Sequence, residues 1–304
     1  MCKFSSGKKF HYVKILLSLL IFQFMLIAVA RCAGNATEQG AEVVIDSKAE
    51  SSAGSDSLTI SPIDEMEMVF VPAGPFVMGL EDGRFDEVPE HEVYLDGFWI
   101  DRTEVTNAMY KTCMQAGACT TPAHDKYYPY EQYSDYPVVY VSWEQANKYC
   151  AWVGGRLPSE AEWEKAARGT DRRLYPWGDE APNSNLLNFA RENGDIMPVG
   201  SFPEGASPYG ALDMAGNAWE WVADWYAAHY YPDSAQINPT GPEEGSFRVC
   251  RGGGWIDFKG GVRVVQRASD MCILKDPANA SYKYRRHFVD NDLSFRCVMD
   301  EIDR

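Results

Sequence analysis

The fold of this chain is decided by residues 155–169, which read GRLPSEAEWEKAARG. Ser159 and Glu162 form a capping box, in which the serine oxygen and the glutamate side chain each satisfy a free amide of the first helical turn. Glu164 and Arg168 lie four residues apart in the order that stabilises a helix. A glycine then follows, as is common where a helix ends. The stretch therefore predicts a short helix that begins after Ser159 and ends at the closing glycine.

Two more helices have start signals nearer the N-terminus. Thr106 can cap a helix that runs to about Gln115, where an Ala-Gly pair follows. Ser142 and Gln145 form a second capping box, and the helix after them runs to about Trp152, before two glycines. All three predicted helices are short, so packing against other elements must stabilise them.

Strand signals surround these helices. Apolar runs at Met68–Pro72 and Phe76–Gly79 are typical of buried strands, and Val93–Ile100 indicates either a strand pair or a bend around Asp96. After Gly169, long stretches rich in Gly, Pro, Asn, Asp and Trp show no periodicity. Their many aromatic residues favour a compact irregular domain over a disordered tail. We therefore expect a largely irregular α+β fold with a few short helices and small antiparallel sheets.

The charge balance excludes one class of partner. The 304 residues include 28 basic and 44 acidic side chains, which gives a formal net charge of −16. A surface this acidic repels phosphate backbones, so the sequence argues against nucleic-acid binding. The acidic composition suits an extracytoplasmic protein or one that binds cations. A solvated acidic surface accounts for most of the charge.

The N-terminus predicts export. Residues 1–30 begin with a lysine-rich segment, continue with the apolar stretch Ile15–Val29 and end in the small-x-small sequence Ala28-Val29-Ala30, the pattern of a signal peptide. The apolar stretch has 15 residues, whereas a membrane span needs about 20. We expect a secreted or periplasmic protein with no transmembrane span in its mature form. A lipoprotein anchor at Cys32 and an uncleaved anchor are the alternatives, although the preceding arginine suits lipoprotein processing poorly.

The remaining chain divides into a linker and a domain. Residues 31–65 are rich in Ala, Gly, Ser and acids, a composition that cannot bury enough surface to fold alone. We therefore predict a flexible linker over 31–65 and one globular domain over 66–304.

The cysteine count favours disulfides. Six of the eight cysteines lie in the predicted domain: Cys113, Cys119, Cys150, Cys250, Cys272 and Cys297. An even number of cysteines in an exported chain is typical of disulfide bonds. A metal cluster is less favoured, because the sequence contains no C-x-x-C pair. Cys113 and Cys119 are near enough in sequence to close a small loop. Six cysteines allow 15 pairings, so the residues alone do not choose among them.

Six ordered motifs together carry a resemblance to a known family. They are Glu104–Asn107 (EVTN), residues 155–169, Tyr175–Gly178 (YPWG), Asp213–Trp221 (DMAGNAWEW), Arg248–Trp255 (RVCRGGGW) and Leu293–Arg296 (LSFR). The series resembles the sulfatase-modifying-factor family, which includes the formylglycine-generating enzymes, and it covers about 235 residues. The resemblance implies a C-type-lectin-like fold with bound calcium. In the enzymes, a copper-bound cysteine pair oxidises a cysteine of a client sulfatase to formylglycine, using oxygen.

The resemblance also implies calcium ligands and disulfide pairs. The family's second calcium site matches Asp213, Gly216, Ala218 and Glu220, and its first site falls near Asn188, Phe189 and Asp195. Carboxylates and backbone carbonyls are the ligands that calcium takes. The segment of the first site is shorter here than in the enzymes. The family's disulfide matches Cys150 with Cys297, which leaves Cys250 with Cys272 beside Cys113 with Cys119.

The segment after Arg248–Trp255 departs from the enzymes. Where they place two cysteines five residues apart, this chain has Asp257 and Val262. Two thiolates suit Cu(I), but a carboxylate and an isopropyl group do not, so copper is not expected. Asp257 with Arg263 and Arg267 could form a polar pocket, or these groups could belong to an ordinary ion-pair cluster. The four histidines of the domain show no metal-binding spacing, and the sequence has no phosphate-binding loop.

Two functions remain open. The first is an exported, non-catalytic module that binds a protein, peptide or glycan partner in the cell envelope. A groove for such a partner could be lined by Tyr127, Tyr128, Tyr130, Tyr133, Tyr226, Tyr230 and Tyr231, although each of these is also a common packing residue. The second is a protein-modifying oxidoreductase of the formylglycine-generating type with a variant active site.

Overall fold

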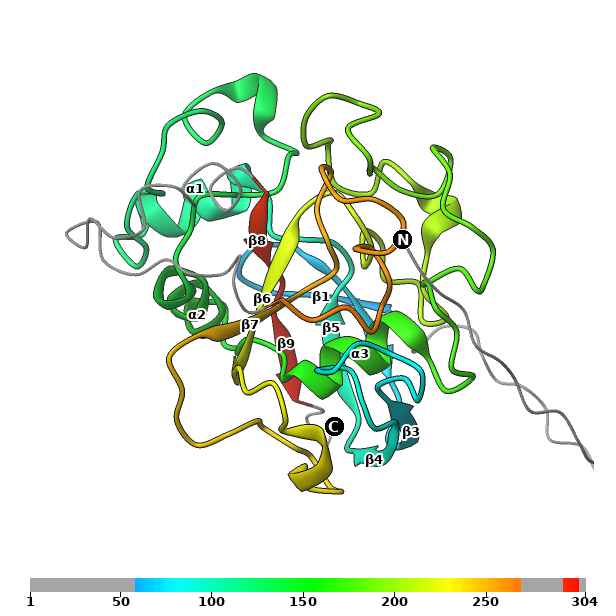
Figure 1. The fold of residues 1–304 in the computed structure, drawn as a ribbon. Helices are drawn as coiled ribbons and strands as arrows, with labels where there is room; N and C mark the ends of the chain where they lie inside the picture. The colour runs from blue at the N-terminus through cyan, green and yellow to red at the C-terminus, as the bar shows by residue number, and fades with distance from the viewer. Residues whose placement is uncertain (1–57, 269–291, 301–304) are drawn as a thin grey trace, which may run out of the picture. The chain divides into compact units, whose positions relative to one another are not determined.

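The computed structural model describes residues 58–268 and 292–300. The predicted signal peptide, Cys32 and most of the predicted linker lie outside these residues. The strands are β1 (Leu58–Ile60), β2 (Glu67–Val71), β3 (Gly74–Met78), β4 (His91–Leu95), β5 (Phe98–Asp101), β6 (Trp219–Trp225), β7 (Arg248–Arg251), β8 (Leu293–Phe295) and β9 (Val298–Asp300). The helices are α1 (Asn107–Gln115), α2 (Trp143–Trp152) and α3 (Glu160–Arg168), with short 3-10 turns at Glu131–Tyr133, Pro203–Gly205 and Tyr231–Asp233. Long irregular segments join these elements (Figure 1).

Three small sheets hold the fold together. The largest has the order β1-β2-β5-β9 and is antiparallel throughout, while β3 and β4 form a separate hairpin. The third sheet has the order β7-β6-β8, and its β6–β8 pair is parallel. The α+β fold with small sheets is as predicted, and the parallel β6–β8 pair is an exception to the expected antiparallel pairing. A parallel pair forms here because β8 follows β6 through a long connection rather than a hairpin.

The structured domain begins earlier than composition indicates. β1 lies inside the segment assigned to the linker, and Leu58, Thr59 and Ile60 pair with Val69, Met68 and Glu67 of β2. Three residues carry little apolar surface of their own, so a composition argument overlooks them. The backbone hydrogen bonds to β2 hold them in place, and the linker boundary at residue 65 is therefore incorrect.

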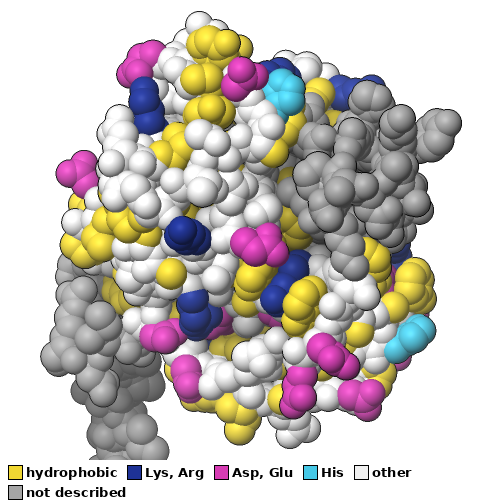
Figure 2. Space-filling model, turned by 90° about the vertical axis from the view of Figure 1, so that its left-hand side faces the viewer, with side chains coloured by type: hydrophobic (Ala, Val, Ile, Leu, Met, Phe, Trp, Pro, Cys, Tyr) yellow, Lys and Arg dark blue, Asp and Glu magenta, His cyan; other side chains and the backbone are white. Residues whose placement is uncertain are grey.

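One face of the molecule carries both acidic and basic side chains. On the face drawn in Figure 2, acidic and basic side chains are interspersed, with hydrophobic side chains between them. Within the described residues, no helix is long and apolar enough to cross a membrane.

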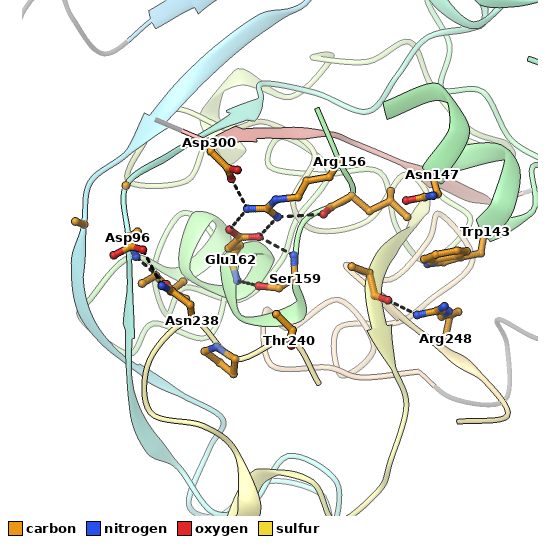
Figure 3. A pocket seen from close by; sticks show the side chains of 16 residues that line it. Asp96, Trp143, Asn147, Arg156, Ser159, Glu162, Asn238, Thr240, Arg248 and Asp300 are labelled. Atoms are coloured by element: carbon orange, nitrogen blue, oxygen red, sulfur yellow. Dashed lines mark hydrogen bonds and ion pairs between the residues drawn. The ribbon is translucent and has the colours of Figure 1, made fainter. Parts of the chain in front are cut away.

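The predicted helices occur where their caps place them. The side chain of Thr106 accepts a hydrogen bond from Met109 N, and both capping boxes are present, at Ser142–Gln145 and Ser159–Glu162. Figure 3 shows Ser159 and Glu162 at the start of α3. All nine residues of α3 are buried, because the helix contacts β3, β4, β6 and β7. α3 therefore lies between the β3–β4 hairpin and the sheet that contains β6 and β7.

Disulfides join distant parts of the fold. Cys113 pairs with Cys119 beside α1, and Cys150 of α2 pairs with Cys297, which follows β8. These are two of the pairs expected above. Cys250 is also disulfide-bonded, and its expected partner, Cys272, lies outside the described residues.

Candidate functional site

The loop after β7 is held closed by backbone geometry and a buried carboxylate. Gly253 has φ +76, and a Cβ at this position would lie 2.5 Å from the carbonyl oxygen of Gly261, so the two ends of the loop touch. Asp257 Oδ2 accepts hydrogen bonds from Trp219 Nε1 at 2.8 Å and from Gly254 N at 2.9 Å. Burial raises the pKa of the Asp257 carboxyl. Asp257 therefore works as an acceptor that fastens the loop to the first residue of β6.

The second position of the expected cysteine pair is part of the core. Val262 is fully buried in a small apolar cluster with Tyr175, Leu187 and Phe189. The neighbouring Gly261 packs directly against Asp257, since a Cβ on Gly261 would lie 3.0 Å from Asp257 Cβ. Phe258, in contrast, is 73% exposed. The loop thus presents a large aromatic side chain outward while its two key positions are engaged in hydrogen bonding and packing.

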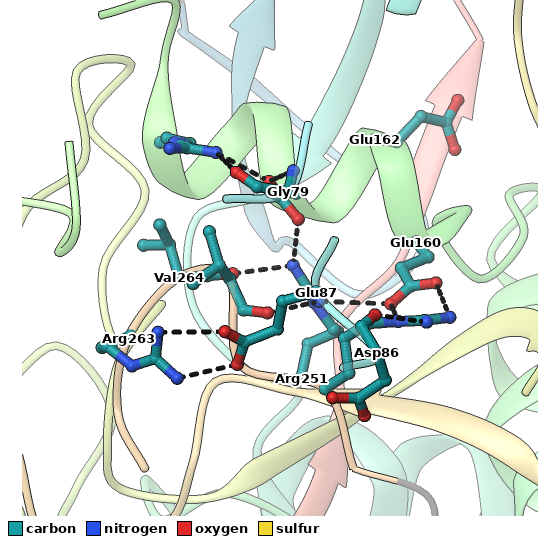
Figure 4. A network of polar contacts seen from close by, with 12 residues as sticks. Gly79, Asp86, Glu87, Glu160, Glu162, Arg251, Arg263 and Val264 are labelled. Carbon is teal, nitrogen blue, oxygen red and sulfur yellow. Dashed lines mark hydrogen bonds and ion pairs between the residues drawn. The ribbon is translucent and has the colours of Figure 1, made fainter. Parts of the chain in front are cut away.

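The polar pocket suggested for Asp257 with Arg263 and Arg267 does not form. Arg263 pairs with Glu87 at 2.7 Å, and Arg267 pairs with Glu160 of α3 at 2.7 Å. Asp257 is instead bonded to Trp219. The arginines belong to an ion-pair cluster, of which Figure 4 shows Arg263 with Glu87 and Arg251 with Glu160. The alternative of ordinary ion pairs therefore holds for the two arginines but not for Asp257.

Of the residues expected at the second calcium site, Asp213 lies beside Glu104, a residue that was not expected there. The carboxyl groups of Asp213 and Glu104 lie against each other, and burial is the main cause that raises the pKa of both. Glu104 Oε1 accepts a hydrogen bond from Asn217 Nδ2 at 3.0 Å. Glu104 Oε2 is buried and has no hydrogen-bond donor among the described residues. Two adjacent buried carboxyl groups, one of them with an unbonded oxygen, can share a proton or take up a cation.

Glu220, also expected at this site, has other partners. Its two oxygens accept from Arg296 Nε and Nη2, both at 2.7 Å, and from Trp163 Nε1 at 2.8 Å. Glu104 is the residue beside Asp213 that reasoning from the sequence missed. The available signal was its place at the head of the EVTN motif, 109 residues before Asp213.

The expected first calcium site lacks a free carboxylate. Asn188 Nδ2 donates to the carbonyl oxygen of Asp195 at 2.9 Å, so the two residues are neighbours. The Asp195 carboxylate, however, binds Lys126 Nζ at 2.9 Å and the Tyr127 hydroxyl. Phe189 packs in the cluster of Val262. Over residues 58–268 and 292–300, no group of three or more His, Cys, Asp or Glu side chains is arranged to hold a metal. The residues at this first site do not fit a calcium ion.

The tyrosines proposed for a groove fall into separate groups. Tyr127 and Tyr133 pack edge to face with ring centroids 5.1 Å apart, near Asp195. Tyr226 and Tyr231 instead lie against the guanidinium group of Arg267, in the ion-pair cluster. These four side chains pack in two separate regions, whereas Tyr130 is 54% exposed.

Comparison with known proteins assigns the family. The model of the sulfatase-modifying factor enzyme 1-like domain matches residues 58–301. The chain is 33% identical over 297 residues to the formylglycine-generating enzyme of Streptomyces coelicolor, covering 76% of this chain and 88% of the enzyme. It is 40% identical over 223 residues to serine/threonine-protein kinase pkn1 of Chlamydia caviae, covering 66% of this chain but only 35% of that protein.

A solved structure agrees with this assignment. The structure of PvdO from Pseudomonas aeruginosa matches with a TM-score of 0.65 and 26% identity, over 80% of this chain and 98% of PvdO. PvdO therefore shares the arrangement of short helices and small sheets described above. Since the family model matches well over half of the sequence, the chain belongs to the sulfatase-modifying-factor family, whose members include the formylglycine-generating enzymes.

Proposed function

We propose that this protein is a non-catalytic member of the family that binds a protein, peptide or glycan partner in the cell envelope. The observation that supports this most is the state of the two loop positions. Asp257 uses its carboxylate to hold Trp219 and Gly254, and Val262 is fully buried in the core. Neither side chain has a sulfur for the soft ion Cu(I), which prefers thiolates. The loop keeps its closed form without the groups of the oxidase.

A binding role is supported by the exposed aromatic residue on the same loop. Phe258 is 73% exposed although its neighbours Asp257 and Gly261 are packed together. Large aromatic side chains of this kind commonly contribute much of the energy of protein interfaces. Phe258 on a closed loop therefore suits contact with a partner surface. The envelope location follows from the signal peptide that the sequence predicts.

The relatives are named for two enzyme activities, a protein kinase and a formylglycine-generating enzyme. The chain spans little more than a third of the Chlamydia kinase it matches, so we do not extend kinase activity to it. The formylglycine-generating enzymes are matched over most of their length. A protein-modifying oxidoreductase that works without the cysteine pair is therefore the competing function.

Copper and peptide assays separate these two functions. The purified protein is titrated with Cu(I) against a chelator and incubated with oxygen and a Cys-x-Pro-x-Arg peptide, with the Streptomyces enzyme as positive control. We expect neither tight Cu(I) binding nor formylglycine in the peptide. The double variant Asp257→Cys/Val262→Cys should gain Cu(I) affinity if the loop geometry has been kept. Oxidation of the peptide by the unaltered protein would overturn the non-catalytic assignment.

A partner assay tests the binding role directly. The full protein and its Phe258→Ala variant are compared in capture from envelope extracts, with Phe85→Ala as the matched control because Phe85 is also exposed, at 58%. A specific partner should be recovered by the unaltered protein and the control but not by Phe258→Ala. Equal recovery by all three proteins would count against the loop as the binding surface.

We also propose one structural calcium ion, held between Glu104 and Asp213. The support is the pair of buried carboxyl groups and the unbonded Glu104 Oε2 described above. Calcium takes carboxylate and carbonyl oxygens without strict geometry, and its charge would offset the repulsion between the two groups. Its role is to stabilise the fold between the segment after β5 and the segment before β6.

A further inference from the structure

A second site lies at the other end of β6. A pocket of about 920 Å³ is lined by residues of α2, the start of α3, the ends of β6 and β9, and the segment 238–240 (Figure 3). Its apolar lining includes Leu95, Leu157 and Ala223. The loop of Asp257 meets β6 at Trp219, whereas the pocket lies near Ala223. Four residues of strand separate these points by roughly 13 Å, so the pocket is distinct from the loop.

One wall of the pocket holds Arg248, which has no ion-pair partner among the described residues, although Glu144 and Asp224 are nearby negative charges. The guanidinium group of Arg248 lies 3.7 Å from the ring centroid of Trp143 and 3.5 Å from that of Trp225, so aromatic rings cover both of its faces. Its Nη1 donates to the carbonyl oxygen of Ala223. Burial lowers the pKa of Arg248, but an arginine stays charged in a protein.

The fully buried arginines show what the half-buried Arg248 lacks. Arg251, Arg267 and Arg296 each form an ion pair with a buried glutamate. Among the described residues, no carboxylate lies within ion-pair distance of Arg248. Its remaining N–H groups therefore lie on the edge of a fixed, partly desolvated plane. A carboxylate is the group that matches such an edge, because it accepts two parallel hydrogen bonds from a guanidinium.

The opposite wall of the pocket is acidic and accepts hydrogen bonds. Asp96 and Asn238 bond to each other, through Asp96 N to Asn238 Oδ1 at 2.9 Å and Asn238 Nδ2 to Asp96 Oδ2 at 2.7 Å. Asp300 is 76% exposed and bonds to Arg156, which Glu162 also holds. Exposed carboxylates here accept N–H or O–H donors and repel a second negative charge. The pocket is therefore suited to a ligand with one anionic end and donors along its length.

We propose that this pocket binds the free carboxyl terminus of a polypeptide. The terminal carboxylate lies on Arg248, amide N–H groups of the preceding residues face Asp96 and Asp300, and an apolar side chain covers Leu157 and Ala223. Capture of a terminal carboxylate is a known mode of peptide recognition. Polyanionic glycans fit less well, since Asp96, Asp300 and Glu162 and the net charge of −16 oppose them. The site goes beyond the loop function and does not depend on it.

The test uses peptides that differ only at the terminus. The full protein is applied to an array of synthetic hexapeptides with free C-terminal carboxylates and to the same array with C-terminal amides. Selected peptides are then measured in solution by fluorescence anisotropy. We expect a set of peptides that bind in the free form and at least tenfold more weakly as amides. Equal binding of both forms, or no binding to either array, would overturn the proposal.

Variants locate the binding to the pocket. Arg248→Met removes the charge and should weaken binding at least tenfold, and the matched control Arg172→Met, at an exposed arginine, should not. Asn147 is exposed on α2, one turn after Trp143, so Asn147→Glu should fold normally and place a competing carboxylate beside Arg248. It should reduce peptide binding to the same extent. Unchanged binding by the folded Asn147→Glu protein would contradict the assignment.

Further measurements distinguish a polypeptide terminus from a small carboxylate or a glycan, and this pocket from the loop of Phe258. An N-acetyl amino acid that binds as tightly as the best hexapeptide would overturn the polypeptide assignment in favour of a small carboxylate. A sulfated oligosaccharide that binds in an Arg248-dependent way, while peptides do not, would overturn it in favour of a glycan. Phe258→Ala should leave peptide binding unchanged, so failure of this proposal can be told apart from failure of the loop function.

Discussion

At the scale of single residues, Asp257 shows how one side chain can close a loop. Its Oδ2 is the acceptor for Trp219 Nε1, and the Trp219 side chain is only 3% exposed. A buried donor that loses its acceptor costs about 1–3 kcal/mol. We therefore expect Asp257→Ala to lower the free energy of unfolding by about that amount. Asp257→Asn keeps an oxygen at this place and should cost less. Urea denaturation of both variants tests this, and equal losses would contradict the acceptor role.

A second residue gives the protein a pH dependence. Asp224 is buried, and burial first, then the neighbouring Glu160, raises the pKa of its carboxyl from 3.8 to about 8. Because the folded state holds this proton more tightly than the unfolded state does, the contribution is stabilising below pH ~4. It is lost progressively as the pH rises to about 8.

The variant Asp224→Asn tests that pH dependence. The amide is neutral at every pH, and its oxygen can still accept from Glu160 N, as Asp224 Oδ2 does at 2.8 Å. We expect the variant to melt several degrees higher than the unaltered protein at pH 8, since about 1 kcal/mol shifts Tm by about 2–4 °C at this size. The two proteins should melt alike near pH 4. Calorimetry at both pH values measures this, and a lower Tm of the variant at pH 8 would refute it.

At the scale of elements, α3 illustrates how far local signals reach. The capping box at Ser159 predicts where the helix starts, and the structure confirms it. The spacing of Glu164 and Arg168 also predicts their ion pair, yet both side chains are almost fully buried rather than on a solvated face. Their burial depends on Arg251, which comes from β7 and binds Glu164 as well. No pattern within the helix indicates a partner 87 residues away.

The two capping boxes should differ in energetic weight. Ser159 is 6% exposed, and its Oγ accepts from Glu162 N at 3.2 Å. Ser142 caps α2 with the same geometry but is only partly buried. Loss of an N-cap costs about 1 kcal/mol, and water can replace a cap only where it reaches the amide. Ser159→Ala should therefore destabilise the protein more than Ser142→Ala. Chemical denaturation compares them, and the opposite order would contradict the argument.

At the scale of the whole molecule, long-range contacts decide what the sequence leaves open. Cys150 and Cys297 are 147 residues apart, and the cysteine count alone allows any of 15 pairings. The resemblance to the family selects Cys150 with Cys297, because a family resemblance carries information about the fold that a cysteine count lacks. The same limit applies to the candidate sites. The sequence predicts that Asp257 stands at a cysteine position, but only the fold shows that it binds Trp219 and that Glu104 lies against Asp213.

The calcium proposal makes the stability of the whole domain depend on a cation. With calcium at about 1,000 times its Kd, binding contributes ~4 kcal/mol, which EGTA would remove. We expect EGTA to lower Tm at pH 7.5 and calcium, but not magnesium, to restore it. The effect should shrink towards pH 5, because burial raises the pKa of Glu104 and Asp213 and protons then compete with the ion.

Variants distinguish the bound ion from a shared proton, the other way to relieve two adjacent carboxyl groups. Glu104→Gln removes one ligand and should abolish the response to EGTA, while Glu67→Gln, at an exposed glutamate that pairs with Arg102, should leave it intact. Calorimetry of the three proteins with and without EGTA provides the measurement. If the pair instead shares a proton, EGTA changes nothing in any of them and Glu104→Gln is neutral or stabilising. That result would remove calcium from the account of this fold and leave Glu104 and Asp213 as a neutralised pair.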